Sequence, residues 1–522
     1  MISKRTLFLA SGAAFAVFGL AAQASDGAPL SAIDWLQRAL EAPIAPTEGP
    51  VGTLLPDETD ARLPATHFAP IETELLEGAG LSSTGIFTAE RIGLPRDLWG
   101  AATHSEVIAA IKTIPTDTVP SAARLALRLL LAEFALPRGD ISVTRDALFL
   151  ARVDKLIELG ALEQAQQLIE VASEASSAIN ARAFDIALLL GEEDRACAAL
   201  SGLITTSYGH GAQIFCTARR GDWQAAYASL RVAQSLALVS ETEALLLTRF
   251  LEEEEEEYPL PPPQETTPLG WRIMEALGDP VTTAGLPIAY AHADMRGTSG
   301  WRAQLEAAER LTRAGVMQPN RLHGLYSERR AAASGGLWDR VRLLQTLDRA
   351  TTMKDSEAAS AALVQAWPLF AAAELEAALA EMKAEALADL SLAPQASEIL
   401  WKLALLSDDA RPAAAALAPE GGLGRLVMAL AEGRDLPQTS SSPIAGAIVA
   451  AFNAEGFSTA NEALLEAGKP GLLLLEGLAL IAEAAAGDLN AATSGLQRLL
   501  AVGLEPVARQ IAIELLLLER RG

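Results

Sequence analysis

The sequence has few of the residues on which metal sites and many catalytic centres depend. Its 522 residues include two cysteines and five histidines, and aromatic residues make up 5% of the chain. The histidines are His67, His104, His210, His292 and His323. None stands in an H-E-x-x-H or comparable metal-ligand spacing, and no nucleophile-elbow, P-loop or dinucleotide-binding pattern follows a strand. The sequence therefore predicts no catalytic, metal-binding or cofactor-binding residue.

Positive charge is also scarce. The chain has 41 Lys and Arg against 66 Asp and Glu, a net charge of −25 at pH 7. A surface of this sign repels nucleic acid and anionic lipid over most of its area. We therefore expect no nucleic-acid partner.

The N-terminus has the pattern of a secretory signal peptide. Lys4 and Arg5 precede an apolar stretch, 6–20, and Ala22-Gln23-Ala24 is an A-x-A cleavage site. A membrane anchor is the alternative, but the apolar stretch is short for a span. We expect residues 1–24 to be removed by cleavage between Ala24 and Ser25 and the mature chain to be periplasmic.

Beyond residue 24 the chain lacks a long uncharged apolar run. The best candidate, 471–486, contains Glu476 and Glu483. We therefore expect no integral membrane span in the mature chain.

Prolines separate the first part of the mature chain from the rest. Seven of them fall within 25–70, which leaves room for one short helix at 31–41. We predict an extended, Pro-rich arm over 25–70. It either lies along the helical body or reaches a partner.

From about residue 72 the pattern is helical. Ala and Leu dominate, and apolar residues recur at spacings of three and four in 121–136 and 145–159. A short motif then repeats, in which a glycine is followed five positions later by a small or branched apolar residue. Its copies begin at Gly160, Gly191, Gly221 and Gly487, with a weaker copy at Gly336.

The motif has a physical explanation. A glycine adopts the left-handed backbone conformation that ends a helix, and an acidic residue in the next first turn is favoured by the helix dipole. The small residue five positions on lets two helices of a hairpin touch. This predicts antiparallel helical hairpins.

The motif resembles the helix–helix turn of tetratricopeptide repeats, G-x-[YWL]-x-x-A. Gly221, Trp223 and Ala226 occupy these positions in one copy, and Gly487, Leu489 and Ala492 in another. The period here is near 30 rather than 34, and the features of the first helix are mostly absent. The resemblance implies an all-α fold, a right-handed solenoid of antiparallel hairpins.

A run of six Glu followed by a Pro cluster interrupts the helical pattern at 252–268. Acidic residues oppose the dipole at a helix C-terminus, and the prolines favour polyproline II. We predict an acidic linker between an N-terminal half, 71–251, and a C-terminal half, 269–522. A binding site for a cation or a basic partner is the alternative for 252–268.

The two cysteines lie on either side of one predicted hairpin. Cys197 and Cys216 are placed symmetrically about a turn near Ser207, so they fall at the same height on adjacent helices. In an exported protein this favours one structural disulfide. Two buried free thiols are the alternative.

One segment departs from the acidic composition. Residues 296–349 contain ten Arg, no Lys and five acidic residues. Arg side chains suit carboxylate and phosphate contacts, so this segment is a candidate face for an anionic ligand or acidic partner. Pairing with acidic residues of neighbouring helices is the alternative. The candidate residues are Arg313, Arg321, Arg329, Arg330, Arg340 and Arg342.

These observations predict a periplasmic, non-enzymatic helical scaffold that binds a protein partner in the cell envelope. A second hypothesis is an envelope enzyme acting on peptidoglycan, and a third is a binder of an anionic ligand or polymer through 296–349. Lytic transglycosylases of the envelope can also carry a long helical superhelix. That family places its catalytic Glu directly before Ser, and this chain has no Glu-Ser dipeptide.

Overall fold

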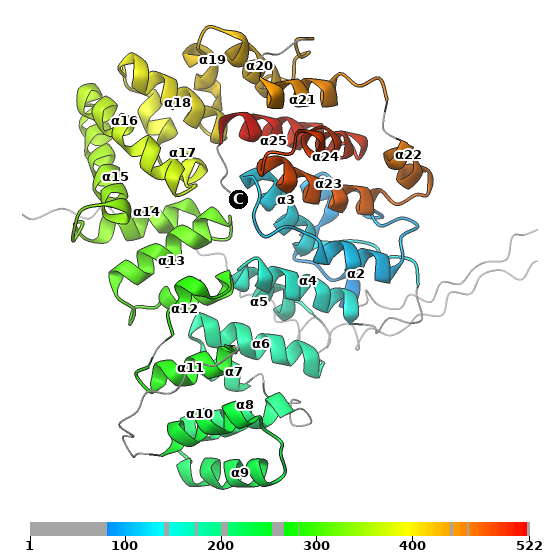
Figure 1. Ribbon diagram of the computed structural model, residues 1–522, viewed down its shortest axis with the longest axis vertical. Coiled ribbons are helices and arrows are strands. Elements are labelled where there is room, and N and C mark those ends of the chain that lie inside the picture. Colours follow the sequence, from blue (N-terminus) through cyan, green and yellow to red (C-terminus); the bar gives the residue numbers. More distant parts are fainter. Residues whose placement is uncertain are drawn as a thin grey trace, which may run out of the picture. The chain divides into compact units, whose positions relative to one another are not determined.

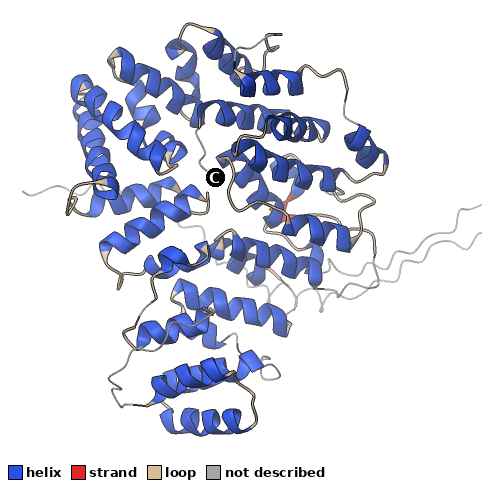
Figure 2. Ribbon diagram, in the orientation of Figure 1, coloured by secondary structure: helices blue, strands red, loops and turns tan. Residues whose placement is uncertain are grey.

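The computed structural model describes residues 81–139, 146–172, 176–198, 200, 207–252, 266–279, 281–438, 442–456 and 459–518. The predicted signal peptide 1–24, its cleavage site at Ala24 and Ser25, the arm 25–70 and most of the linker 252–268 lie outside these residues. The described elements belong to one compact unit, Leu75–Gly522. Most of them are helices (Figures 1 and 2), which confirms the predicted helical class.

The first group of helices runs to the end of the predicted linker. It comprises α2 (His104–Lys112), α3 (Pro120–Leu131), α4 (Ala147–Glu158), α5 (Leu162–Glu170), α6 (Ser177–Leu190), α7 (Glu193–Ala198), α8 (Ser207–Arg219), α9 (Trp223–Ser235), α10 (Glu241–Leu251) and α11 (Pro268–Ala276). Short 3-10 helices η1 (Leu81–Ser83) and η2 (Ala89–Ile92) precede them.

The second group follows two further 3-10 helices, η3 (Thr283–Gly285) and η4 (Ile288–Tyr290). It comprises α12 (Ala291–Asp294), α13 (Trp301–Arg313), α14 (Pro319–Glu328), α15 (Gly336–Met353), α16 (Ser356–Ala372), α17 (Glu376–Ala388), α18 (Pro394–Leu406), η5 (Arg411–Ala413), α19 (Ala414–Leu417), α20 (Gly422–Ala431), α21 (Pro443–Phe452), α22 (Thr459–Glu466), α23 (Pro470–Ala485), α24 (Leu489–Ala501) and α25 (Glu505–Leu517).

The glycine motif marks hairpin turns in four of its five copies. Gly160, Gly191, Gly221 and Gly487 follow α4, α6, α8 and α23, and all have positive φ. Each of the four helices packs against the next one in sequence. The residue five positions on is fully buried in every case: Ala165, Ala196, Ala226 and Ala492. The proposed reason for the small residue, close helix contact, is therefore confirmed.

The weaker copy at Gly336 behaves differently. Gly336 is the first residue of α15, so it begins a helix instead of ending one. The same turn appears where the sequence has no glycine. Lys354 ends α15 with φ 54°, Asp355 caps α16 and Ala359, five positions after Lys354, is fully buried. A motif defined by glycine does not detect a helix end at which another residue adopts the left-handed conformation.

The all-α prediction needs one small correction. Phe87–Thr88 (β1) pairs in parallel with Ala132–Glu133 (β2). The pairing brings the backbone at Gly85 so close to β2 that a Cβ there would overlap Glu133. A glycine permits this close backbone approach.

Buried cations stabilise the region around this pair. Arg152 in α4 is 5% exposed and donates to the carbonyl oxygens of Leu130, Ala132 and Thr84 at 2.8, 3.0 and 2.7 Å. Burial lowers the pKa of Arg152 to about 10, so it stays charged at neutral pH. Lys155, one turn on, donates to the carbonyl oxygens of Lys112 and Ile114. Both side chains donate hydrogen bonds to backbone carbonyl oxygens at the ends of neighbouring elements.

The first helices of the described chain pack against the last. Helix α3 contacts α25 and α23, and α2 contacts α23. Glu514 of α25, 2% exposed, accepts hydrogen bonds from the Ser121 backbone N and Oγ at 2.9 and 2.6 Å. Lys469 pairs with Glu106 at 2.6 Å, and Ala101 N donates to Gly468 O at 2.7 Å. We call this set of contacts the closure.

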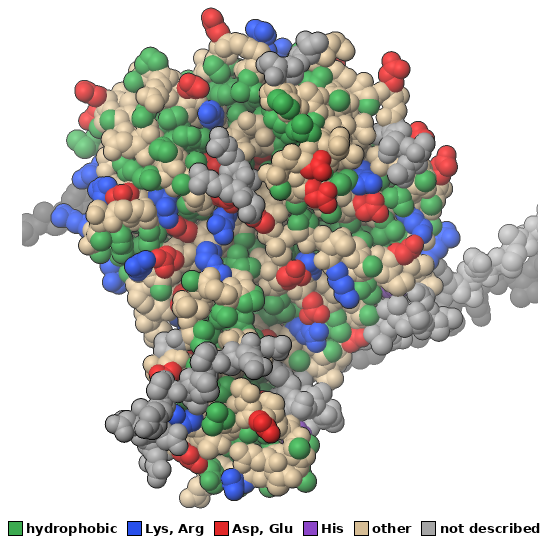
Figure 3. Space-filling view, viewed as in Figure 1, with side chains coloured by type: hydrophobic (Ala, Val, Ile, Leu, Met, Phe, Trp, Pro, Cys, Tyr) green, Lys and Arg blue, Asp and Glu red, His purple; other side chains and the backbone are tan. Residues whose placement is uncertain are grey.

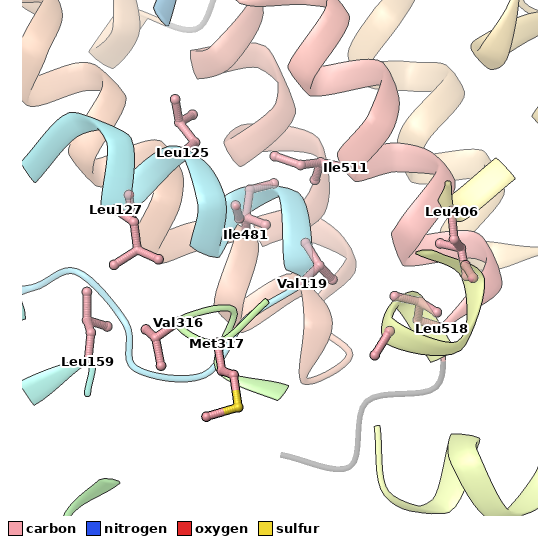
Figure 4. Close-up of a cluster of buried hydrophobic side chains, with 14 of the residues drawn as sticks. Val119, Leu125, Leu127, Leu159, Val316, Met317, Leu406, Ile481, Ile511 and Leu518 are labelled. Atoms are coloured by element: carbon pink, nitrogen blue, oxygen red, sulfur yellow. The ribbon is translucent and has the colours of Figure 1, made fainter. Parts of the chain in front are cut away.

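An apolar core continues through the closure. Figure 4 shows buried side chains from α3, α23, α25, the end of α18, the residue after α4 and the loop between α13 and α14. They belong to the larger of the buried clusters. Those labelled are Val119, Leu125, Leu127, Leu159, Val316, Met317, Leu406, Ile481, Ile511 and Leu518. An open solenoid has no such contact between its ends, so the predicted right-handed superhelix is not confirmed.

A second buried cluster lies in α6 to α11. Phe184, Phe215, Leu230 and Leu247 are among its members, and each is at most 2% exposed. Helix α11 packs against α6 and α10, although it follows the predicted linker 252–268 in sequence. Helices of both predicted halves therefore share one core here.

Candidate interaction surfaces

The predicted disulfide is present. Cys197 on α7 and Cys216 on α8 are bonded, with their Cα atoms 5.5 Å apart. Both lie in the cluster formed by α6 to α11, where Cys216 is 1% exposed and Cys197 packs at the edge. The bond fixes the short helix α7 to α8, and α8 in turn packs against α9.

Helix α9 exposes aromatic side chains beside this disulfide-linked pair. Trp223 is 49% exposed and Tyr227, one helical turn later, is 41% exposed. The Trp223 ring lies 5.8 Å from that of Phe250 on α10, and Phe250 lies 5.5 Å from buried Phe215. The Trp223 ring therefore packs on a stack of aromatic rings that reaches the core. Trp223 stands at the [YWL] position of the repeat motif.

Exposed apolar side chains are concentrated in this part of the described chain. Five of the ten large hydrophobic side chains that are exposed there belong to α9, its C-cap and α10. The five are Trp223, Tyr227, Val232, Leu236 and Leu245. Isolated exposed hydrophobics are ordinary, but a concentration of this kind is typical of interaction sites. We call Trp223 and Tyr227 the α9 aromatic pair.

A carboxyl group with an unusual pKa lies behind the same hairpin. Glu243 of α10 approaches Gly211 of α8 so closely that a Cβ at Gly211 would overlap its carboxylate. Burial raises the pKa of Glu243 to about 7, against a smaller lowering by the Ser240 backbone. A titratable group therefore lies at the contact between α10 and α8.

The Arg-rich segment 296–349 separates into paired and unpaired residues. Arg340 is the most buried of the six candidates, and its Nε donates to Glu309 at 2.8 Å. Tyr326 donates to the same carboxylate, and burial followed by the Glu309 charge raises the pKa of Tyr326 well above its usual value. This cluster joins α13, α14 and α15 and is structural.

Several more of the ten Arg have partners within the chain. Arg321 pairs with Glu163 at 2.7 Å and Arg342 with Asp339 at 2.5 Å. Arg296 pairs with Glu275 and Glu193. Arg302 pairs with Glu306, and Arg310 donates to two backbone carbonyl oxygens. These Arg residues therefore make contacts within the chain, as the alternative interpretation of the segment expected.

The remaining Arg side chains are exposed. They are Arg313, Arg329, Arg330 and Arg349, and none of them has an ion-pair partner among the described residues. Figure 3 shows Lys and Arg side chains gathered on the left of the view, over α14 and α15. Of the six candidates, Arg313, Arg329 and Arg330 are therefore free to contact a partner, and Arg349 is a further residue of this kind.

A cavity of about 440 Å³ lies beside η3, α12 and α13, and no pattern in the sequence indicates it. Asp294 lines it, accepts a hydrogen bond from Thr283 and has its pKa raised chiefly by burial. Two further carboxylates in the lining have cationic partners: Glu275 pairs with Arg296, and Glu306 pairs with Arg302. Trp271 and Ala307 also line the cavity.

Two searches of the described residues concern metals and membranes. No group of three or more His, Cys, Asp or Glu side chains among them is placed to hold a metal ion. None of the helices in the described ranges combines the length and apolar character that crossing a bilayer requires.

Comparisons with known proteins give no assignment. The chain matches no protein-family model, no curated protein and no solved structure. The likeness to tetratricopeptide repeats therefore rests on the turn motif and its hairpin geometry.

Proposed function

We propose that this chain is a periplasmic, non-enzymatic scaffold that binds another protein of the cell envelope through helical hairpins resembling tetratricopeptide repeats. The α9 aromatic pair is the observation that carries the proposal. Trp and Tyr are enriched among the residues that dominate binding energy at protein interfaces. Here two such rings, Trp223 and Tyr227, stand half exposed on a helix whose neighbours are fixed by a disulfide.

Rigid support makes these rings suitable for binding. A ring that is already held by its neighbours loses little conformational freedom when a partner covers it. The stack from Trp223 through Phe250 to Phe215 supplies that support. Arg231 follows Tyr227 by one turn on α9, and Arg is the third residue type enriched at such sites.

The location of the protein is part of the proposal. The disulfide between Cys197 and Cys216 fits an oxidising compartment, and the N-terminal pattern of the sequence predicts export. N-terminal sequencing of the protein from its native host should begin at Ser25. A mature chain that begins at Met1 would remove the periplasmic assignment.

Site-directed photocrosslinking in native cells tests the binding proposal. A benzophenone amino acid at Tyr227 should crosslink to one protein, and the same probe at Gln395, an exposed residue of α18, serves as the control. With that partner purified, Trp223→Ala together with Tyr227→Ala should weaken binding by about 30-fold or more, the loss typical of a binding hot spot. Equal labelling from both positions would contradict the proposal.

A second candidate function rests on the cavity. The lining of the cavity includes Asp294, a half-buried carboxyl whose pKa burial raises, and carboxyl groups are among those that serve as general acids. The cavity would then belong to an envelope enzyme acting on peptidoglycan. Release of soluble fragments from purified peptidoglycan, reduced about 100-fold by Asp294→Asn, would support this candidate. No release by the wild-type protein would remove it.

A further inference from the structure

Two exposed Arg residues lie along one face of α15, and one of them, Arg349, has no ion-pair partner among the described residues. Arg342, Arg349 and Met353 are spaced by seven and four residues, so they lie on one face of the helix. All three are exposed, Met353 by 75%. We call them, together with Arg329 and Arg330, the basic stripe.

The segment after α14 joins this face. The Gln345 side chain, which lies between Arg342 and Arg349 along α15, donates to the carbonyl oxygens of Tyr326 and Arg329 at 2.7 Å each. The backbone of Arg329 is therefore held against α15 on the side of the stripe. Arg330 follows it directly in the chain.

The charge of the stripe is not neutralised within the described part of the chain. Arg329, Arg330 and Arg349 lack an ion-pair partner there, and Arg342 pairs with Asp339 at its exposed edge. Glu328 is the nearest exposed acidic residue in sequence. Other Arg of the same segment, such as Arg340 and Arg321, are compensated by carboxylates. In a chain of net charge −25, this leaves a local excess of positive charge.

We infer that the basic stripe binds an acidic polypeptide segment of the partner protein. This inference rests on the proposed scaffold function and adds a second contact surface to the α9 aromatic pair. Arg342 and Arg349 are about 10 Å apart along the helix axis, a separation that suits carboxylates distributed along a chain rather than one small anion. Exposed Met353 at the end of the stripe suits an apolar side chain of the same segment.

The overall charge argues against other polyanions. A molecule of net charge −25 repels nucleic acid and an anionic bilayer over most of its surface. A short acidic segment contacts the stripe alone and avoids most of that repulsion. Charge complementarity is therefore satisfied by a peptide of limited length.

Photocrosslinking from the stripe tests the inference. A benzophenone amino acid at Met353, in the full-length protein in its native cells, should crosslink to a segment rich in Asp and Glu in a different protein. Mass spectrometry of the crosslinked peptide identifies that segment. Arg329→Glu, Arg330→Glu and Arg349→Glu combined should lower the crosslink yield about tenfold or more, because three attractions become repulsions.

A matched variant controls for net charge. Arg91→Glu, Arg128→Glu and Arg425→Glu change the total charge equally at exposed positions outside the stripe and should leave the yield unchanged. Thermal melting of both variants checks their folding. A synthetic peptide of the crosslinked sequence should show the same discrimination in fluorescence anisotropy.

Several outcomes overturn the inference. They are an absent crosslink, a crosslinked segment without acidic residues, attachment to lipid, attachment to the six-Glu run of a second copy, or an equal yield from the two triple variants. If crosslinking from Tyr227 persists in any of these cases, the inference about the stripe fails while the proposed scaffold function stands. If labelling from Tyr227 fails as well, both are lost.

Discussion

The closure and the α7–α10 region are held together in different ways. In α7–α10, each helix packs mainly on its neighbours in sequence, and a disulfide spans 19 residues. In the closure, Ser121 meets Glu514 and Glu106 meets Lys469, pairs that are 393 and 363 residues apart. The first region depends on local contacts, and the second depends on the whole chain between its two ends.

This difference has consequences for stability. A change in α7–α10 should loosen that region and leave α3 intact, since the two belong to different buried clusters. A change in the closure removes contacts from both ends of the described chain at once. Effects should therefore spread further from the closure than from the hairpins.

The largest effect is expected beside α3, at Arg152. Arg152→Met keeps much of the volume but leaves the carbonyl oxygens of Leu130, Ala132 and Thr84 without their donors. We expect a loss of about 3–4 kcal/mol in the free energy of unfolding. Urea unfolding followed by circular dichroism measures it. Arg128→Met, at an exposed site on α3, should cost about 0.5 kcal/mol or less. Equal losses in the two variants would show that the hydrogen bonds of Arg152 to the three carbonyl oxygens contribute nothing to stability.

Removing the disulfide should have the next largest effect. Cys197→Ser with Cys216→Ser releases a loop of 19 residues, which costs about 3 kcal/mol in a chain-entropy treatment. Hydrogen exchange should accelerate in α7–α10 and stay unchanged in α3. Faster exchange in α3 to the same degree would erase the distinction between the two regions.

Close packing in the hairpins gives a smaller effect. Ala226, five residues after Gly221, is fully buried between α8 and α9. Ala226→Leu should cost about 1–3 kcal/mol through overpacking. Ala228→Leu on the exposed side of α9 is the control and should be close to neutral. Thermal melting distinguishes the two substitutions.

A further effect concerns pH. The folded-state pKa of Glu243 lies above its usual value, so the folded state holds a proton that the unfolded state releases. Stability should therefore fall as pH rises from about 4.5 to about 7 and stay level above that. Glu243→Gln should flatten this part of the profile and raise the melting temperature at pH 8. A profile identical to that of the wild type would show that Glu243 is well solvated.

The hairpins could be predicted from sequence because their determinants are local. A glycine with positive φ, an acidic N-cap and a buried small residue all lie within six positions, as in Gly221, Asp222 and Ala226. The register of Cys197 and Cys216 follows from their equal separation in sequence from the predicted turn near Ser207. Lys354 adopts the left-handed conformation that the motif assigns to glycine, so the motif does not identify the equivalent turn at this position.

Other features left no such signal. Ser121 and Glu514 belong to unremarkable helices, and nothing in either local pattern indicates that they meet. The partners of the Arg residues are equally remote in sequence: Arg321 pairs with Glu163 across 158 residues. Composition identified the basic segment, but only three-dimensional contacts separate structural Arg340 from exposed Arg349.

Hydrogen exchange on a closure variant tests the difference between the two regions most directly. Glu514→Leu removes the acceptors of the Ser121 backbone N and Oγ, whereas Glu514→Gln keeps an acceptor oxygen at the same place. With leucine at 514, we predict faster exchange in α2, α3, α23 and α25 together, with α8–α10 unchanged, and a much weaker effect with glutamine. Faster exchange confined to α25, or spread evenly over α8–α10 as well, would contradict the account.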